Sequence, residues 1–259
     1  DPLWSRGLGD VYKRQANTYS GTTKVSEGTL ALGASGSLAS GSSAQIASGA
    51  TLDLGSHNQT LADAKVNGTL AGSGTFTVNG LLSGSGTVTS DTVVNGTHGP
   101  GNSPGIQTFS GNLTYSSGAG ILLQVADNTT NNSPVAYDQI VVSKDLAFSG
   151  PVNLNLSFAD SGSIVDWSDA FWQSSQSWTL YSVSGITTGF ENLSLVSSNW
   201  ADANGLLFNS ALADGVFTLS LGQNGKDVLL NYAIPEPSTY ALFGLGAVVL
   251  VIAARRRRA

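Results

Sequence analysis

Two histidines and a few paired carboxylates are the side chains of this chain that are suited to acid–base chemistry. His57 and His98 are its only histidines, and histidine is the commonest general base in enzymes. The segment "DWSDAFW" places Asp166 and Asp169 three residues apart, and paired carboxylates are the catalytic groups of glycoside hydrolases. His98 follows a glycine-rich stretch and precedes Gly99 and Pro100, so we expect an exposed turn residue there and not a base.

Three further carboxylates, Asp53, Asp63 and Asp91, are expected to line one face of a β-structure. The body of the chain has no arginine and few lysines to neutralise a uronate substrate, so a polysaccharide lyase would lack its electrostatic stabilisation. Carboxylates at arbitrary spacing are commonly solvated surface residues. We therefore expect no catalytic residues and no enzymatic activity.

Metal and cofactor sites are not indicated either. The chain has no cysteine, which excludes disulfides, thiolate metal sites and a cysteine nucleophile. It has neither an EF-hand spacing nor a GGxGxD repeat, so a calcium site is not supported. The sequence predicts no metal and no other cofactor, and a secreted fold would be held by packing and hydrogen bonds.

The charge balance excludes nucleic acid as a partner. Between Ala16 and Ile234 the chain has four lysines, fourteen acidic residues and no arginine, a balance of −10. Binding to phosphates requires clustered lysine and arginine.

The first fifteen residues differ from the rest in composition. "SRGLGDVYKRQ", from Ser5 to Gln15, can be encoded by a nucleotide sequence that resembles a transposase-type sequencing adapter read in frame. We expect residues 1–15 to be an assembly artefact and leave them out of the fold prediction. The chain also has no methionine, which indicates a fragment of a longer protein.

Glycine-threonine-apolar triplets recur through the first hundred residues. They begin at Gly28, Gly68, Gly74 and Gly86, and the related "GATLDL" begins at Gly49. The intervals from 28 to 49, 49 to 68 and 68 to 86 are 21, 19 and 18 residues, and β-rich repeats near twenty residues are typical of solenoids. The sequence therefore predicts an all-β fold, a right-handed parallel β-helix.

Single segments support this prediction. Leu30 and Leu32, like Leu52 and Leu54, alternate with small or polar residues, so they should point into the core from one face of a strand. Turns between strands are expected at three asparagines: Asn67, Asn79 and Asn95.

The segment "NTYSGTTKVSEGTLALG", Asn17 to Gly33, resembles the autotransporter-associated β-strand repeat. The resemblance implies a β-helical stalk like the passenger of a bacterial surface protein, over residues 16–98. Residues 99–158, which include "PGNSPG" and strands with alternating apolar residues, resemble the continuation of such a helix. We expect Pro100 and Pro104 to lie in a tight irregular turn.

Residues 159–233 are rich in aromatic residues and include Trp167, Trp172, Trp178 and Trp200. Solenoids need bulky caps over their open ends, so we expect a β-structured cap here. The alternative is a carbohydrate site in which the exposed rings of Trp172 and Trp178 contact a glycan.

The C-terminal segment combines Pro235-Glu236-Pro237, an uncharged apolar run and four arginines. The prolines favour an extended segment that a protease can bind. A helix over the apolar run would span about 22 Å, short of the hydrocarbon core of about 30 Å, but flanking arginines can snorkel. The predicted membrane span consists of Tyr240, Ala241, Leu242, Phe243, Gly244, Leu245, Gly246, Ala247, Val248, Val249, Leu250, Val251, Ile252, Ala253 and Ala254. The cytoplasmic basic cluster, assigned by the positive-inside rule, consists of Arg255, Arg256, Arg257 and Arg258.

This three-part tail, residues 234–259, resembles the PEP-CTERM sorting signal that exosortases process. The resemblance implies export in a Gram-negative-type bacterium, transient anchoring in the inner membrane, cleavage near Pro235–Pro237, and a final place at the cell surface or in the extracellular matrix. We expect a structural or adhesin-like protein of the surface or biofilm matrix. The alternative is a module that binds exopolysaccharide, and a polysaccharide-degrading enzyme comes a distant third.

Overall fold

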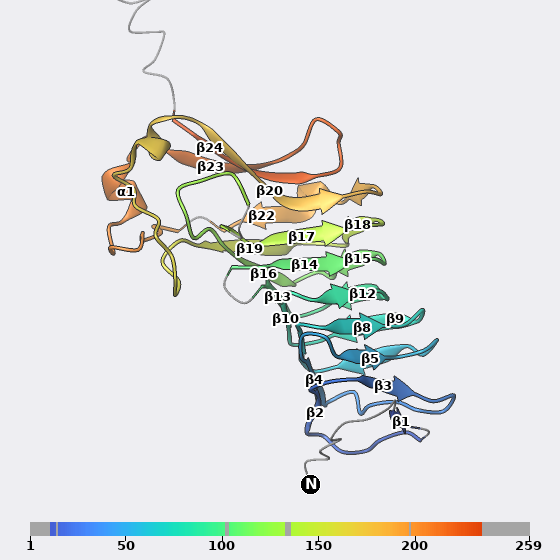
Figure 1. The fold of residues 1–259 in the computed structure, drawn as a ribbon. Helices are drawn as coiled ribbons and strands as arrows, with labels where there is room; N and C mark the ends of the chain where they lie inside the picture. The colour runs from blue at the N-terminus through green and yellow to red at the C-terminus, as the bar shows by residue number, and fades with distance from the viewer. Residues whose placement is uncertain (1–10, 14, 102–103, 133–135, 197, 235–259) are drawn as a thin grey trace, which may run out of the picture.

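The computed structural model describes residues 11–13, 15–101, 104–132, 136–196 and 198–234. Its strands form three long sheets that are parallel throughout the body and stack along one axis (Figure 1). The first sheet runs in the order β1 (Val11–Lys13), β3 (Thr29–Leu32), β5 (Thr51–Asp53), β8 (Thr69–Ala71), β11 (Thr87–Val88), β14 (Ile106–Phe109), β17 (Gln139–Val142), β20 (Gln176–Val183), β24 (Val228–Ala233) and β23 (Val216–Leu221).

The two other sheets interleave with the first along the chain. The second runs in the order β2 (Thr22–Val25), β4 (Ser43–Ile46), β7 (Ala64–Val66), β10 (Leu81–Gly84), β13 (Thr97–Pro100), β16 (Gly120–Gln124), β19 (Val152–Ser157) and β22 (Leu193–Leu195). The third runs in the order β21 (Thr187–Thr188), β18 (Leu146–Phe148), β15 (Leu113–Tyr115), β12 (Asp91–Val94), β9 (Thr75–Val78) and β6 (Gln59–Leu61). This mostly β architecture of long parallel sheets is compatible with the predicted β-helix.

The triplet repeat sets the register of the first sheet. Thr29 pairs with Thr51, Thr51 with Thr69, Thr69 with Thr87, and Thr87 with Thr108. The triplet at Gly74 is different, because its threonine, Thr75, lies in β9 of the third sheet. Equivalent residues at the predicted period therefore stack directly above one another.

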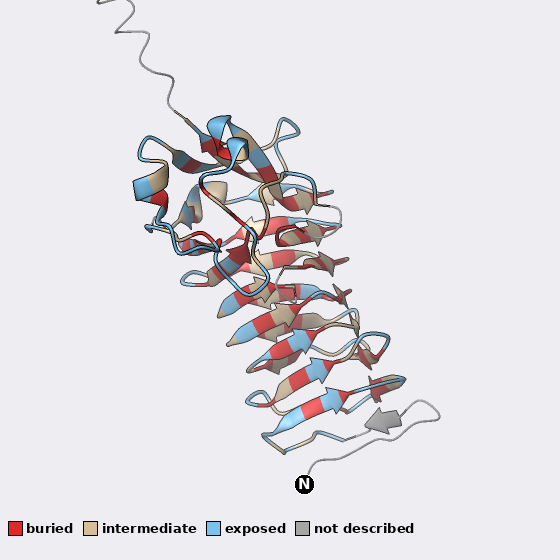
Figure 2. Cartoon of the chain, turned by 60° about the vertical axis from the view of Figure 1, so that its left-hand side comes forward, coloured by how far each residue is buried: buried red, intermediate tan, exposed pale blue. Residues whose placement is uncertain are grey.

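The core is a column of apolar side chains between the three sheets. In Figure 2 the strands of the stacked rungs carry buried segments beside exposed or intermediate ones. The predicted inward residues Leu30, Leu32, Leu52 and Leu54 are all buried. Each threonine of the triplets is followed by a residue that points inward, so the row continues through Leu70, Val88 and Phe109. Because each rung covers its neighbour, one rung alone could not bury this surface.

Tight corners connect the sheets, and several consist of the dipeptide Asn-Gly. Asn67, Asn79 and Asn95 each lie between two strands, as predicted. The side chain of Asn95 donates to the Oδ1 of Asn79, 2.8 Å away, one rung below. A Cβ on Gly68 would collide with the carbonyl oxygens of the preceding rung, so glycine is required where successive corners touch.

The expectation of an irregular turn at Pro100 and Pro104 is correct for Pro104, which lies between β13 and β14, and wrong for Pro100. Thr97–Pro100 is strand β13, paired with β10 and β16, and not part of an irregular turn. Residues 102 and 103 lie outside the described part. The strands between residues 99 and 158 belong to the same three sheets as the repeats before them.

The C-terminal part departs from the parallel pattern. β24 pairs antiparallel with β20, and β23 pairs antiparallel with β24 (Figure 1). Short helices lie in the connections: η1 (Ala170–Gln173), η2 (Phe190–Asn192) and α1 (Phe208–Ala211). A cluster of aromatic rings lies beneath this hairpin and includes Phe158, Trp167, Trp172, Trp178, Trp200, Phe208, Phe217 and Tyr232.

The strand β1 comes from the segment that we attribute to a sequencing adapter. It pairs with β3 at the N-terminal edge of the first sheet.

Candidate functional sites

The paired carboxylates Asp166 and Asp169 organise their own loop. Asp166 Oδ1 accepts hydrogen bonds from the backbone N–H of Ser168, at 2.8 Å, and from its hydroxyl, at 2.6 Å. These bonds lower the pKa of the exposed Asp166 carboxyl. Asp169 Oδ1 accepts from the N–H of Phe171 at 2.7 Å and caps η1. Both carboxylates thus satisfy backbone donors of the turn in which they lie.

The expectation that Asp53, Asp63 and Asp91 line one face is wrong. Asp53 lies in β5 of the first sheet, Asp63 precedes β7 of the second, and Asp91 begins β12 of the third. Asp63 Oδ1 accepts from the N–H of Leu81 and Asp91 Oδ1 from that of Asn112, each in the following rung. Within the described residues, no three histidine or acidic side chains are grouped closely enough to hold a metal ion.

His98 is fully buried, and the expectation of an exposed turn residue is wrong. It occupies an inward position of β13, between Leu82 of β10 and Ile121 of β16 in the sheet register. Its Nε2 lies 2.7 Å from Oε1 of Gln107, and its Nδ1 lies 2.6 Å from the hydroxyl of Tyr115. Sequence pattern alone missed this, because "THGP" has the composition of a turn.

The hydrogen bonds of His98 belong to a buried series in which each side chain donates to the next. Tyr181 donates to the Tyr115 oxygen at 2.9 Å, and the Gln107 amide nitrogen donates to the carbonyl of Ser83 at 3.4 Å. Gln107 therefore accepts from Nε2–H of a neutral imidazole, whose Nδ1 accepts from Tyr115. Burial lowers the pKa of His98 to about 4, so the imidazole is neutral at pH 7 with both nitrogens engaged.

The structure corrects the glycan-platform interpretation of Trp172 and Trp178. Both residues have no exposed surface, and their rings pack 5.8 Å apart between centroids. The indole N–H of Trp172 donates to Oδ1 of Asn128 at 2.9 Å, and that of Trp178 donates to the carbonyl of Thr129 at 2.8 Å. Neither ring offers a face to a sugar, because the aromatic cluster needs both faces for packing.

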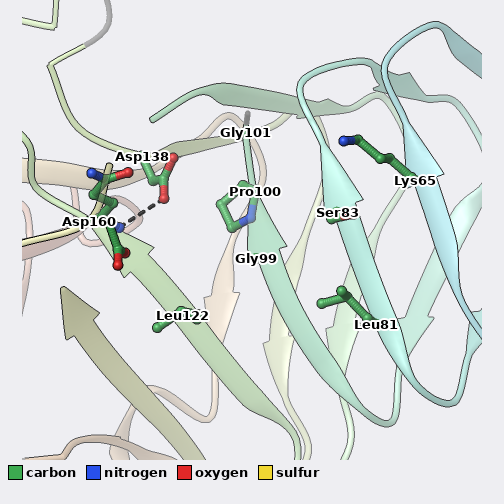
Figure 3. A pocket seen from close by; sticks show the side chains of 10 residues that line it. Lys65, Leu81, Ser83, Gly99, Pro100, Gly101, Leu122, Asp138 and Asp160 are labelled. Carbon is green, nitrogen blue, oxygen red and sulfur yellow. Dashed lines mark hydrogen bonds between the residues drawn. The ribbon is translucent and has the colours of Figure 1, made fainter. Parts of the chain in front are cut away.

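A groove that the sequence did not reveal crosses the outer face of the second sheet. It has a volume of about 350 Å³ and runs over β7, β10, β13 and β16. In Figure 3, Asp138 and Asp160 lie at one end of the groove and Lys65 lies at the other. Leu81 and Leu122 contribute its apolar surface, and each is 46% exposed.

Asp138 is the buried acid of this groove. Its Oδ1 accepts from the N–H of Gly105 at 2.7 Å, and its Oδ2 accepts from the N–H of Gln124 at 2.8 Å. Burial raises the pKa of Asp138 to about 7, and the nearby Asp160 carboxylate also raises it. Asp138 is therefore close to half protonated at neutral pH.

Gln124, whose backbone N–H donates to Asp138, has a side-chain amide without a hydrogen-bond partner among the described residues. Its amide oxygen and amide nitrogen are both buried and unpaired, and the residue is only 3% exposed. An unsatisfied buried polar group costs about 1–3 kcal/mol. The only signal in the sequence was a glutamine at the end of the alternating strand "GILLQ", which does not distinguish a ligand-binding residue from a surface residue.

The predicted sorting residues lie outside the described part of the chain. They are Pro235, Glu236 and Pro237, the apolar run 240–254 and the arginines 255–258. Within the described residues, no helix has the length and apolar character needed to cross a membrane.

Comparison with known proteins bears on this tail. Residues 233–258 match the PEP-CTERM protein-sorting motif, which indicates a protein that is exported and sorted by an exosortase to the surface of a Gram-negative-type bacterium. No family match covers the autotransporter-associated β-strand repeat, which stays a resemblance. A search of the curated proteins gave no match. The chain therefore combines a body of parallel β-sheets with a C-terminal motif that indicates export and sorting by an exosortase.

Proposed function

We propose that this protein is a structural, adhesin-like component of the cell surface or extracellular matrix, without catalytic activity. The proposal rests on one observation: the continuously stacked β-sheets are followed directly by a sorting motif. The three sheets share one apolar core through successive rungs, and the motif begins at residue 233, the last residue of β24. Such a body would act as a stiff spacer that holds its distal end away from the membrane.

The catalytic candidates that the sequence offered, His98, Asp166 and Asp169, have structural roles in the fold, which supports the proposal of a non-catalytic role. His98 is sealed inside the core with both ring nitrogens bonded. Asp166 and Asp169 are engaged with backbone donors of their own loop.

The proposed export route has two steps. Residues 240–254 would hold the body at the inner membrane, with the arginines 255–258 in the cytoplasm, until the exosortase cleaves near Pro235–Pro237. The support for the anchor is the sequence pattern alone. Cleavage would then release the body or transfer it to the cell surface.

The experiment follows processing in a host with and without an exosortase. We expect the full chain to shorten and to reach the surface only in the exosortase host, and Glu236→Ala to block both changes. Glu191→Ala is the matched control, because Glu191 is an exposed acid far from the motif in the chain. A chain that stays full-length and membrane-bound in both hosts would show that the tail is a permanent anchor.

The structural role has a separate test. Cells that display the processed protein should adhere to a surface or retain matrix better than cells that carry Glu236→Ala, at equal expression. Equal adhesion of the two strains would contradict the proposal even if the sorting were correct.

A further inference from the structure

The groove on the second sheet has the size and lining of a binding site and goes beyond the structural role proposed above. It crosses four neighbouring strands, which corresponds to about 14 Å at the usual strand spacing. The small residues Ser83 and Gly99 leave the centre of the groove open. An elongated ligand could therefore lie along the stacking axis, across successive rungs.

The unpaired amide of Gln124 indicates what the ligand must offer. Within the part of the chain that the structure describes, both the donor and the acceptor of this side chain lack partners, so a ligand group that both donates and accepts would satisfy it. A hydroxyl group does both. Asp138, whose pKa is raised to about 7, can accept from a ligand hydroxyl as the carboxylate and donate to one as the acid.

The charges at the groove disfavour a polyanion. Asp138 and Asp160 lie at one end, and Lys65 is the only basic residue among the described residues that line the groove. The body as a whole carries an excess of acidic residues, so a chain of uronates would meet repulsion along its length. Leu81 and Leu122 add exposed apolar surface against which the C–H faces of sugar rings can pack.

We propose that this groove binds a segment of a neutral polysaccharide, with the amide of Gln124 and the carboxyl of Asp138 as its polar anchors. In the ligand-free protein the Gln124 amide is covered, and it turns toward the groove when a sugar hydroxyl replaces its missing partners. Leu81 and Leu122 pack against the ring faces. Asp160, beside Asp138, disfavours an anionic chain at that end of the groove.

The test measures binding to the full chain, purified in a polyoxyethylene detergent whose head group contains no sugar. Calorimetric titrations use three uncharged glucose hexamers (cellohexaose, laminarihexaose and maltohexaose), hexagalacturonate as an anionic probe, and a chitosan hexamer as a cationic probe. We expect saturable binding of at least one uncharged hexamer and weaker binding of hexagalacturonate, whereas the chitosan hexamer shows how much positive charge alone contributes to binding.

Two variants test the groove through different atoms. Gln124→Leu keeps the side-chain volume and removes the amide, and it should weaken binding about tenfold, the effect of one lost hydrogen bond. Leu122→Glu alters an exposed position and should weaken binding at least as much without unfolding the sheet. Ile186→Glu is the matched control, because Ile186 is 56% exposed and does not line the groove.

Several outcomes would overturn the proposal. One is that none of the three uncharged hexamers binds, and another is that only a charged hexamer binds. Binding that Leu122→Glu and Ile186→Glu leave equally unchanged would place the sugar elsewhere. Thermal unfolding of each variant shows whether it is folded, and exosortase processing is measured independently, so a failure here leaves the sorting result intact.

Discussion

The Nε2–H of His98 donates to Oε1 of Gln107 across 2.7 Å inside the apolar core of the stacked sheets. This bond ties β13 of the second sheet to β14 of the first. On its other nitrogen His98 accepts from Tyr115, a residue of β15 in the third sheet. One neutral imidazole therefore links all three sheets in the middle of the body.

We expect His98→Phe to lower the free energy of unfolding by about 1–3 kcal/mol, because Oε1 of Gln107 loses its buried donor. The substitution also removes a pH dependence. The pKa of His98 is about 4 in the folded protein and 6.5 when exposed, so its stabilising effect is complete above pH 6.5 and is lost as the pH falls toward 4. Urea unfolding between pH 4 and 7 measures both effects, and an unchanged pH slope in the variant would contradict the assignment.

The pH dependence of stability that Asp138 contributes should have the opposite sign. The pKa of this carboxyl rises from 3.8 to about 7 on folding, so the folded protein holds a proton that the unfolded chain releases. The stabilising effect is complete below pH 3.8 and is lost as the pH rises through about 7. In the His98 variant only the Asp138 effect remains, so the free energy of unfolding should fall as the pH rises from 4 to 7. In the Asp138 variant only the His98 effect remains, so it should rise over the same range.

The substitution Asp138→Asn tests this expectation. The amide has one oxygen for the two backbone donors of Gly105 and Gln124, so we expect a loss of about 1–3 kcal/mol from the donor left unpaired. Asp214→Asn, at an exposed site, is the control and should leave the free energy of unfolding nearly unchanged. A variant at Asp138 with the pH slope of the parent protein would show that another group titrates.

The corner glycines should be sensitive to a single added methyl group. In Gly68→Ala the Cβ would collide with the carbonyl oxygens of Ala47 and Ala50, and we expect a loss of about 1–3 kcal/mol from the forced shift of the rungs. Gly41→Ala is the control, because a Cβ there meets nothing within 4 Å. Thermal unfolding should separate the two variants, and equal melting temperatures would mean that the corners are not tightly stacked.

Substitution of Trp172 or Trp178 should lower the free energy of unfolding and leave sugar binding unchanged. We expect Trp172→Ala to cost about 3–5 kcal/mol, as for other large residues removed from a core. Trp178→Phe keeps most of the ring and loses the bond to the Thr129 carbonyl, which corresponds to about 1 kcal/mol. Near-ultraviolet circular dichroism during unfolding reports on the cluster directly. A folded Trp172→Ala variant of unchanged stability would contradict the packing described here.

The sequence was informative where equivalent residues recur at a fixed interval. The spacing of the triplets at Gly28, Gly49, Gly68 and Gly86 predicted stacked strands, and Thr29, Thr51, Thr69 and Thr87 pair in that register. The alternation around Leu30 and Leu52 predicted the buried face. The tail was readable for a related reason, because a sorting signal is recognised as a linear segment and does not depend on the fold.

Only the tertiary structure decided the environment of the polar residues. His98 has the neighbours of a turn in the sequence, yet the pairing of β13 with β10 and β16 places it inside the core. Gln124 and Asp138 are fourteen residues apart and meet because the chain returns from the second sheet to the first. Local sequence determined which segments are extended and which positions alternate. The stacking of distant rungs determined which polar side chains are buried together, because burial depends on neighbours that lie a full rung away along the chain.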